Sequence, residues 1–182
     1  FALVGFGQNC EVRNISVDGA GLTTSRGFSG SLGGYVYLCK AANCTDGGFT
    51  AGNHVLCEAT GCSAVAAFNS STTCYGCTAH DNTFTGFVSG ILVKCVASNN
   101  TGASSDGFSF TLNGSSCINC VAYANGRHGF IFSPVTSARV YLFVNCLSVS
   151  NVSFGYSSPA FDCGFLNNCA AFGNATNFDT DI

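Results

Sequence analysis

Charged side chains are scarce in this sequence of 182 residues: six are Lys or Arg, nine are Asp or Glu, and together they form 8% of the chain. The net charge of −3 provides no basic surface for nucleic acid or for an anionic membrane. No stretch approaches about eighteen consecutive apolar residues, which excludes a membrane-spanning helix. The sequence therefore excludes nucleic acid as a partner and predicts no membrane span.

Proline and methionine are also scarce. Only two Pro occur and no low-complexity linker interrupts the chain, so we expect one domain over residues 1–182. Met is absent and the sequence begins at Phe1, which indicates a processed protein or an excised fragment. A removed signal peptide is the simplest interpretation. We therefore expect a secreted protein that is extracellular or at the cell surface.

Cys and Gly, by contrast, are abundant and form a repeat of Cys-x-Ala/Ser-x-x-Asn followed by Gly-Phe. The repeat cysteines, taken as offset 0, are Cys39, Cys57, Cys77, Cys95, Cys120, Cys146 and Cys169. Offset +2 is always small: Ala41, Ala59, Ala79, Ala97, Ala122, Ser148 and Ala171. Offset +5 holds Cys44, Cys62, Asn82, Asn100, Asn125, Asn151 and Asn174. An aromatic residue, usually after Gly, recurs at Phe6, Phe28, Phe49, Phe68, Phe87, Phe108, Phe130, Tyr156 and Phe178.

The intervals between repeat cysteines, 18 to 26 residues, are typical of a solenoid with one turn of backbone per repeat. Offset −2 is apolar in most copies, so offsets −2, 0 and +2 alternate as one buried face of a strand does. The residues at offset −2 are Tyr37, Val55, Tyr75, Val93, Ile118, Val144 and Asn167. We predict an all-β, single-stranded parallel β-helix with three short strands per coil. The nine aromatics define about eight coils, of which residues 1–34 form an irregular N-terminal one and residues 35–182 the regular ones.

The corners of these coils are predicted at Asn and Gly. An Asn stack at offset +5 can pass amide hydrogen bonds from coil to coil. The Gly before each aromatic residue permits a corner with positive φ. Stacks of Cys, Ala and Phe are expected to fill the interior.

The segments 119–125 (Asn-Cys-Val-Ala-Tyr-Ala-Asn) and 127–130 (Arg-His-Gly-Phe) show the repeat in full. Over roughly residues 35–178 the chain resembles the right-handed parallel β-helix superfamily, which includes pectate lyases, polygalacturonases and phage tailspikes. The resemblance implies a right-handed coil. It implies no particular chemistry, because the catalytic signatures of the polygalacturonases and pectate lyases are absent.

Thirteen cysteines in a secreted protein suggest disulfides, although interior cysteines can also act as small buried hydrophobic residues. The favoured disulfide joins Cys44 to Cys62, which both replace the corner Asn on consecutive coils. Two Cys-x-x-Cys pairs begin at Cys74 and Cys117, but neither has a second pair and a His nearby, so no metal site is predicted. No cofactor is expected.

Seven Asn-x-Ser/Thr sequences are candidate acceptors for N-linked glycans: Asn14, Asn43, Asn69, Asn99, Asn113, Asn151 and Asn174. The corner positions of Asn151 and Asn174 make these two the least suitable, because an amide that faces inward cannot carry a glycan. Better candidates are Asn69, Asn99 and Asn113. Glycans would cover a weakly charged surface with hydrophilic groups.

Catalytic candidates are few, because the acidic residues are spread along the chain and no two form a clear glycosidase pair. The best polar cluster is Asp106, His128 and Arg127, in which Asp106 and His128 each precede the Gly of a Gly-aromatic motif on consecutive coils. A coil-to-coil ion pair predicts the same arrangement. His80 with Asp81 form a weaker cluster, and Lys40 with Glu58 an ordinary cross-strand pair. We therefore expect no enzyme activity.

The repeat runs close to both ends of the sequence, and offset +1 becomes apolar in the later coils, at Val96, Val121, Leu147 and Ala170. Exposed coil edges recruit further strands, and a contact that does not close produces a filament. The leading hypothesis is an extracellular structural glycoprotein, a disulfide-reinforced β-helix that binds copies of itself head to tail in a fibre or surface layer. Alternatives are a β-helix that binds or cleaves extracellular polysaccharide, and a tailspike-like adhesin module.

Overall fold

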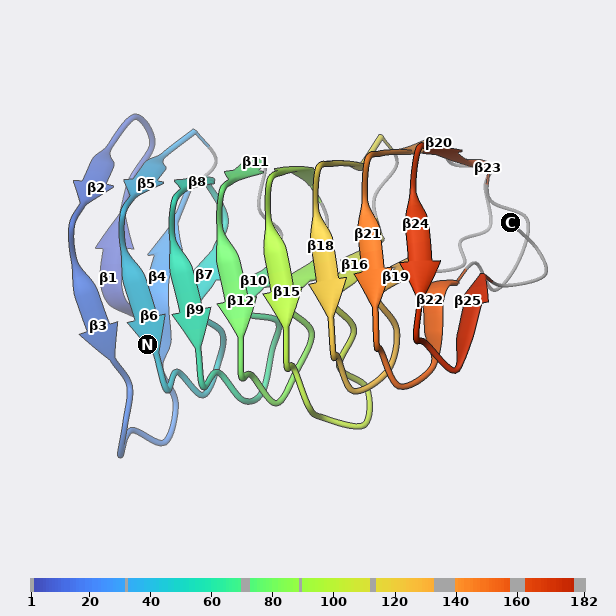
Figure 1. The fold of residues 1–182 in the computed structure, drawn as a ribbon. Helices are drawn as coiled ribbons and strands as arrows, with labels where there is room; N and C mark the ends of the chain where they lie inside the picture. Colours follow the sequence, from blue (N-terminus) through green and yellow to red (C-terminus); the bar gives the residue numbers. More distant parts are fainter. Residues whose placement is uncertain are drawn as a thin grey trace.

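The computed structural model describes residues 2–31, 33–69, 73–88, 90–111, 114–132, 140–157 and 163–178. These residues form a parallel β-solenoid whose coils follow one another in a row along a single axis (Figure 1). The described residues contain strands and turns and no helix. Accordingly, nothing in the described part of the chain qualifies as a helix that could cross a membrane.

Three parallel sheets form the sides of the solenoid. Sheet A contains β1 (Ala2–Phe6), β4 (Arg26–Gly30), β7 (Phe49–Thr50), β10 (Phe68–Asn69), β13 (Phe87–Val88), β16 (Phe108–Phe110), β19 (Phe130–Phe132), β22 (Phe154–Ser157) and β25 (Thr176–Phe178). Sheet B contains β2 (Glu11–Arg13), β5 (Tyr35–Tyr37), β8 (Asn53–Val55), β11 (Thr73–Tyr75), β14 (Ile91–Val93), β17 (Ser116–Ile118), β20 (Val140–Val144) and β23 (Cys163–Asn167). Sheet C contains β3 (Ser16–Asp18), β6 (Lys40–Ala42), β9 (Glu58–Thr60), β12 (Thr78–His80), β15 (Val96–Ser98), β18 (Val121–Tyr123), β21 (Leu147–Val149) and β24 (Ala170–Phe172).

Backbone in the left-handed region makes the corners on either side of sheet C. The corner between sheets B and C lies at offset −1 and has positive φ at Asn14, Leu38, Leu56, Gly76, Lys94, Asn119, Asn145 and Asn168. The corner after sheet C lies at offset +4 and has positive φ at Asn43, Gly61, Asp81, Asn99, Ala124, Ser150 and Gly173. Asn, Asp and Gly predominate because they enter this region at the least steric cost.

The corner at offset −1 corrects one prediction. Because a left-handed residue separates offset −2 from offset 0, the alternation of the strand does not continue across it. Offset −2 therefore points outward, and offset −3 is the inward position of sheet B. The buried residues at offset −3 are Val36, His54, Cys74, Leu92, Cys117 and Phe143.

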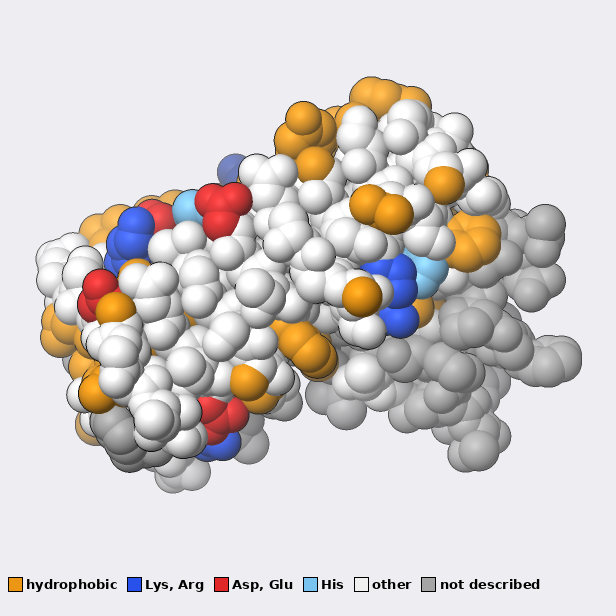
Figure 2. All heavy atoms as spheres, turned by 90° about the horizontal axis from the view of Figure 1, so that it is seen from below, with side chains coloured by type: hydrophobic (Ala, Val, Ile, Leu, Met, Phe, Trp, Pro, Cys, Tyr) orange, Lys and Arg blue, Asp and Glu red, His pale blue; other side chains and the backbone are white. Residues whose placement is uncertain are grey.

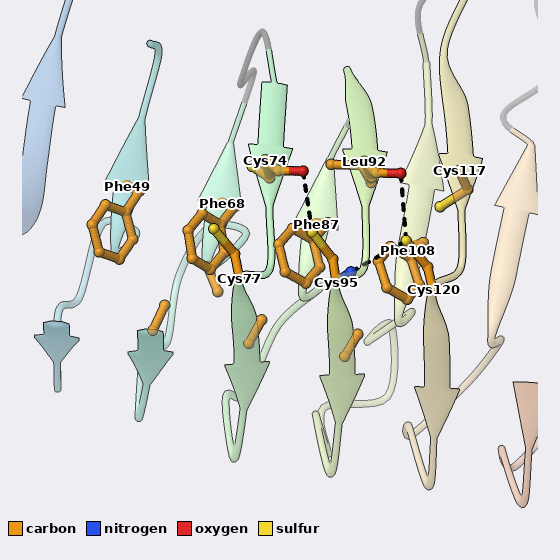
Figure 3. Close-up of a cluster of buried hydrophobic side chains, with 14 of the residues drawn as sticks. Phe49, Phe68, Cys74, Cys77, Phe87, Leu92, Cys95, Phe108, Cys117 and Cys120 are labelled. Atoms are coloured by element: carbon orange, nitrogen blue, oxygen red, sulfur yellow. Dashed lines mark hydrogen bonds between the residues drawn. The ribbon is translucent and has the colours of Figure 1, made fainter. Parts of the chain in front are cut away.

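The repeat cysteines at offset 0 line the interior, as predicted, and all are buried except Cys169, which is half-buried. From Cys39 to Cys146, each of these thiols donates a hydrogen bond to a backbone carbonyl of the preceding coil, for example from Cys77 Sγ to His54 O at 3.4 Å and from Cys95 Sγ to Cys74 O at 3.4 Å. Figure 3 shows these thiols between the strands of neighbouring coils. Cys thus fills a narrow corner while it also pairs with the backbone.

The aromatic column of sheet A is a continuous stack, part of which is visible in Figure 3. Ring centroids of successive residues from Phe28 to Phe178 lie 4.7 to 5.4 Å apart, with interplanar angles of 4° to 10°. Phe6, however, is not part of the stack, because the register pairs Val4 with Phe28 and Phe6 with Gly30. Sheets B and C each hold eight strands, and one turn of backbone separates each strand from the next in its sheet. The solenoid therefore has about seven turns rather than the predicted eight.

The Gly before each aromatic residue serves close packing, and the predicted positive φ is wrong at these positions. Positive φ is found at other glycines. A Cβ on Gly107 would lie 2.7 Å from Gly129 O, 2.9 Å from Asn125 Nδ2 and 3.0 Å from Ala122 Cβ. The small residue at offset +2 and the Asn at offset +5 therefore share one packing partner, because both contact the Gly of the preceding coil.

Candidate functional site

The strongest polar cluster predicted from the sequence does form, at the turn that leads from sheet C into sheet A. Asp106 is 1% exposed, and its two carboxylate oxygens accept hydrogen bonds from Arg127 Nε at 2.8 Å and Arg127 Nη2 at 2.5 Å. The backbone N–H of His128 donates to Oδ1 of the same carboxylate at 3.2 Å. The hydrogen bond with Asp106 raises the pKa of Arg127.

This cluster connects three coils. His128 stacks on Phe154 of β22 with ring centroids 5.4 Å apart, and its Nδ1 accepts the N–H of Phe154 at 3.3 Å. Asp106 is thus buried beneath an Arg of the next coil, and the carboxylate does not face solvent. The arrangement suits a coil-to-coil tie better than a general acid or base, which must reach a substrate.

A second polar cluster lies on the outer face of sheet C in the early coils. The predicted pair of Lys40 and Glu58 is confirmed, with Nζ and Oε1 2.7 Å apart. The same carboxylate lies 3.0 Å from His80 Nε2, and His80 Nδ1 lies 2.7 Å from Asp81 Oδ2. Hydrogen bonds from Lys40 and then His80 lower the pKa of Glu58. Partial burial opposes protonation of His80, but its hydrogen bonds to Asp81 and Glu58 raise its pKa overall.

The Asn column at offset +5 passes amide hydrogen bonds along the solenoid, as predicted. Asn82 Nδ2 donates to Asn100 Oδ1 at 2.8 Å, Asn100 to Asn125 at 2.8 Å, Asn125 to Asn151 at 2.8 Å, and Asn151 to Asn174 at 2.9 Å. Each Oδ1 also accepts a backbone N–H of the preceding coil, for example that of Asn125 on Asn151 at 3.0 Å. The column therefore satisfies buried backbone groups that lie outside the three sheets.

Cys44 and Cys62 continue this column in the first coils, where the prediction places a disulfide. Both are buried, and both are free thiols. A mutual hydrogen bond lowers the pKa of Cys44, and the same contact, together with burial, raises that of Cys62. The Cys44–Cys62 disulfide remains a prediction.

The two Cys-x-x-Cys pairs are interior positions of successive strands. Cys74 and Cys117 lie at offset −3, and Cys77 and Cys120 at offset 0, all buried. Within the ranges that the structure describes, no group of three or more His, Cys, Asp and Glu side chains could hold a metal ion.

The glycan acceptors differ in accessibility. Asn14, Asn43 and Asn99 are exposed and lie at left-handed corners, whereas Asn69 and Asn174 are half-buried. Asn151 is 2% exposed and its amide nitrogen also donates to Ser148 Oγ at 3.0 Å, so it cannot carry a glycan in the folded chain. Asn113 lies outside the described residues.

The outer surface carries few charges, and Figure 2 shows them as small isolated groups on a largely uncharged face. The predicted apolar stripe at offset +1 lies on the outside of sheet C. Within it, Val96, Val121 and Leu147 are half-buried and Ala170 is exposed. At offset +3 the same strands add Tyr123 and Phe172, which are 48% and 53% exposed.

The sequence interpretation missed the outer face of sheet B, because it placed offset −2 inside. The signal that could have revealed this face is the run of Asn and Gly at offset −1, which marks a left-handed corner. No protein-family model matches the chain, and the search of curated proteins found no significant match.

Proposed function

We propose that this chain is an extracellular structural glycoprotein whose coils stack end to end, copy upon copy, in a fibre or surface layer. The observation that carries the proposal is the repetition inside the solenoid. The interior columns of Cys, of small residues, of Asn and of aromatic residues each join one coil to the next through the same type of residue. Asp106, the best catalytic candidate, belongs to these coil-to-coil contacts as well.

The edge strands support contact between copies. β1, β2 and β3 lie at one edge of their sheets, and β25, β23 and β24 at the other. An edge strand has unpaired backbone groups that another strand can bind. If one copy continues the register of another, Val4 stacks on Phe178, Ile15 on Cys169, and Val17 on Ala171, so each column meets an apolar or small residue.

Negative-stain electron microscopy of this 182-residue chain at several concentrations tests the proposal. We expect filaments with an axial repeat of about 35 to 40 Å, which corresponds to seven to eight coils at about 4.8 Å each. Val4→Lys places a charge at the open end of the aromatic column and should abolish the filaments. Ser29→Lys, on the outer face of sheet A, should leave them intact. Discrete monomers or trimers of the unmodified chain would refute end-to-end assembly.

The glycan part of the proposal is strongest for Asn99, which is exposed at a corner and so directs a glycan away from the coil edges. Expressed through a eukaryotic secretory pathway, the chain should lose mass on treatment with peptide N-glycosidase. Asn99→Gln should remove one glycan, whereas Asn151→Gln should remove none. An unmodified Asn99 in secreted material would contradict this assignment.

A further inference from the structure

The outer face of sheet B is apolar along the solenoid. The outward positions of β5 to β23 are offsets −4 and −2 of each coil. Their apolar and aromatic members are Tyr35, Tyr37, Val55, Tyr75, Ile91, Val93, Ile118, Leu142, Val144 and Phe165. The others are Asn53, Thr73, Ser116 and Asn167, so none of these positions is charged. We call this set of residues the sheet B strip.

Sheet A shows that an apolar exterior is not required by the fold. Its outward positions, one residue after each aromatic of the stack, are Ser29, Thr50, Asn69, Val88, Ser109, Ile131 and Ser157. Most of these are polar. In the strip, by contrast, Tyr35 and Ile91 are each 45% exposed, Leu142 is 43% exposed and Phe165 is 61% exposed. A contiguous apolar surface of this kind marks an interaction site.

The corner beside the strip provides a second, independent observation. Leu38 and Leu56 have φ of 52° and 53°, where a branched side chain is unfavourable, and they are 55% and 52% exposed. Asn or Gly occupies the same corner in most other coils. Leu is thus conformationally unfavourable at both positions. Leu56 Cδ2 packs over Gly76 of the next coil, and the exposed part of both side chains extends the apolar strip around the corner.

We propose that the sheet B strip is the interface through which two copies of this chain form a side-by-side dimer. The strip repeats at the strand spacing of about 4.8 Å over seven strands, so a full-length partner must present the same period. A second copy has that period, and two such sheets pack face to face about 10 Å apart. The fourteen strip positions themselves carry no charge. The corner residue Lys94, however, places its Nζ 5.4 Å from the Tyr75 ring centroid and donates a hydrogen bond to the Tyr75 hydroxyl at 3.1 Å. A two-fold arrangement of the strip must therefore keep the two Lys94 ammonium groups apart.

The size of the strip fits a weak contact between two copies. Seven strands span about 29 Å, and three residues with the corner span about 13 Å, which gives a flat area of about 400 Å² per copy. Two copies bury about 800 Å², to which the uneven side-chain surface adds. This total lies below about 1,200 Å², the size at which stable, specific interfaces begin, so we expect a dimer that dissociates on dilution. The charged pair Glu11 and Arg13 on β2 marks one end of the strip.

Sedimentation velocity in reducing buffer, from about 2 to 200 µM protein, tests the dimer. Every chain in this experiment carries Val4→Lys, so that end-to-end assembly does not add to the mass. The mass of one chain is 18.7 kDa, and we expect about twice this value at the upper concentrations. The double variant Ile91→Lys with Leu142→Lys should stay monomeric over the whole range. Both residues are more than two-fifths exposed, so their replacement should leave the melting temperature close to that of the unmodified chain. The matched control is Tyr123→Lys, an equally exposed position on sheet C, which should dimerise normally.

The inference goes beyond end-to-end assembly, because the strip lies on the side of the solenoid and not at a coil edge. Val4→Lys should therefore abolish filaments and leave the dimer unchanged. Three results would overturn the proposal: a Val4→Lys chain that is monomeric at every concentration, a folded double variant that dimerises normally, or a Tyr123→Lys replacement that alone prevents dimerisation. The last result would move the contact to sheet C.

Discussion

At the scale of the residue, two histidines of this chain have pKa values that are shifted in opposite directions. Burial lowers the pKa of His54 to about 3; its ring is fully buried and meets Phe49 and Phe68 edge-on, with centroids 5.2 and 5.7 Å away. His80, on the outside of sheet C, has a raised pKa. Only His54 lies in an interior column, in which Val36 precedes it and Cys74 and then Leu92 follow it.

We predict that His54 makes the fold acid-sensitive. Between pH 6.5, its ordinary pKa, and about 3, the unfolded chain binds a proton that the folded chain does not, so stability falls as pH falls through this range. The loss should be on the order of a few kcal/mol by about pH 3. His54→Leu should remove this part of the pH dependence. Chemical denaturation at pH 7, 5 and 3.5 provides the comparison, and parallel curves for both proteins would contradict the prediction.

At the scale of the element, the coil depends on contacts between the sheets as much as on the strands themselves. The Gly-aromatic motif illustrates this. In most coils the Gly lies beneath the small residue of sheet C and the corner Asn. Gly5, which also precedes a Phe, is in a different register, and the nearest atom to a Cβ there would be Ser29 O at 4.0 Å.

Gly107→Ala and Gly5→Ala should therefore differ sharply. Alanine at position 107 would overlap the backbone of the next coil and the amide of Asn125, and we expect a loss of about 2 to 4 kcal/mol in the free energy of unfolding. At position 5 the change should stay within about 0.5 kcal/mol. Thermal and denaturant unfolding measure both. Equal effects would show that local conformational preference, and not close packing, explains the motif.

The same elements show how far the sequence predicts the structure. The columns at offsets 0, +2 and +5 could be predicted from the sequence because the same or closely similar residues repeat at each offset. The inward position of sheet B could not be predicted, because its side chains, among them Val36, His54, Cys74 and Leu92, differ in size and polarity. Phe6 was wrongly assigned to the aromatic column because it follows a Gly, although the strand pairing places Val4, and not Phe6, beside Phe28. At the candidate site, the grouping of Asp106 with Arg127 and His128 was predictable from offsets, whereas the burial of the carboxylate required the turn geometry.

At the scale of the whole molecule, the three sheets pair each described strand with its counterparts in the coils before and after it. Stability in such a solenoid is close to a sum over coils and their interfaces. The coil lengths also differ, and the extra residues lie between strands, so the register of the columns does not depend on them.

Deletion of residues 77–94 should therefore leave a folded solenoid that is one coil shorter. The deletion removes one member of each interior column and joins Gly76 to Cys95, so Phe68 then faces Phe108, and Cys62 faces Asn100. We expect a β-sheet circular dichroism spectrum and one cooperative transition at a lower temperature. Deletion of residues 77–85 alone removes β12 but keeps β13 and β14, and it should abolish cooperative folding. A folded product from the half-coil deletion would contradict this account of the register.

The direction of the sheet hydrogen bonds has a mechanical consequence. The strands of all three sheets run around the solenoid, so the hydrogen bonds between them lie along its axis. We call the contact between two successive coils a junction. Tension applied to the two ends of the chain is resisted at every junction by the hydrogen bonds of three sheets together. When one junction yields, the freed coil of about 18 to 26 residues extends by roughly 60 to 90 Å, while the remaining junctions stay closed. A single chain pulled at its two ends would therefore lengthen in steps and absorb work at each one, whereas a junction between two copies, which no covalent bond crosses, would separate without this extension.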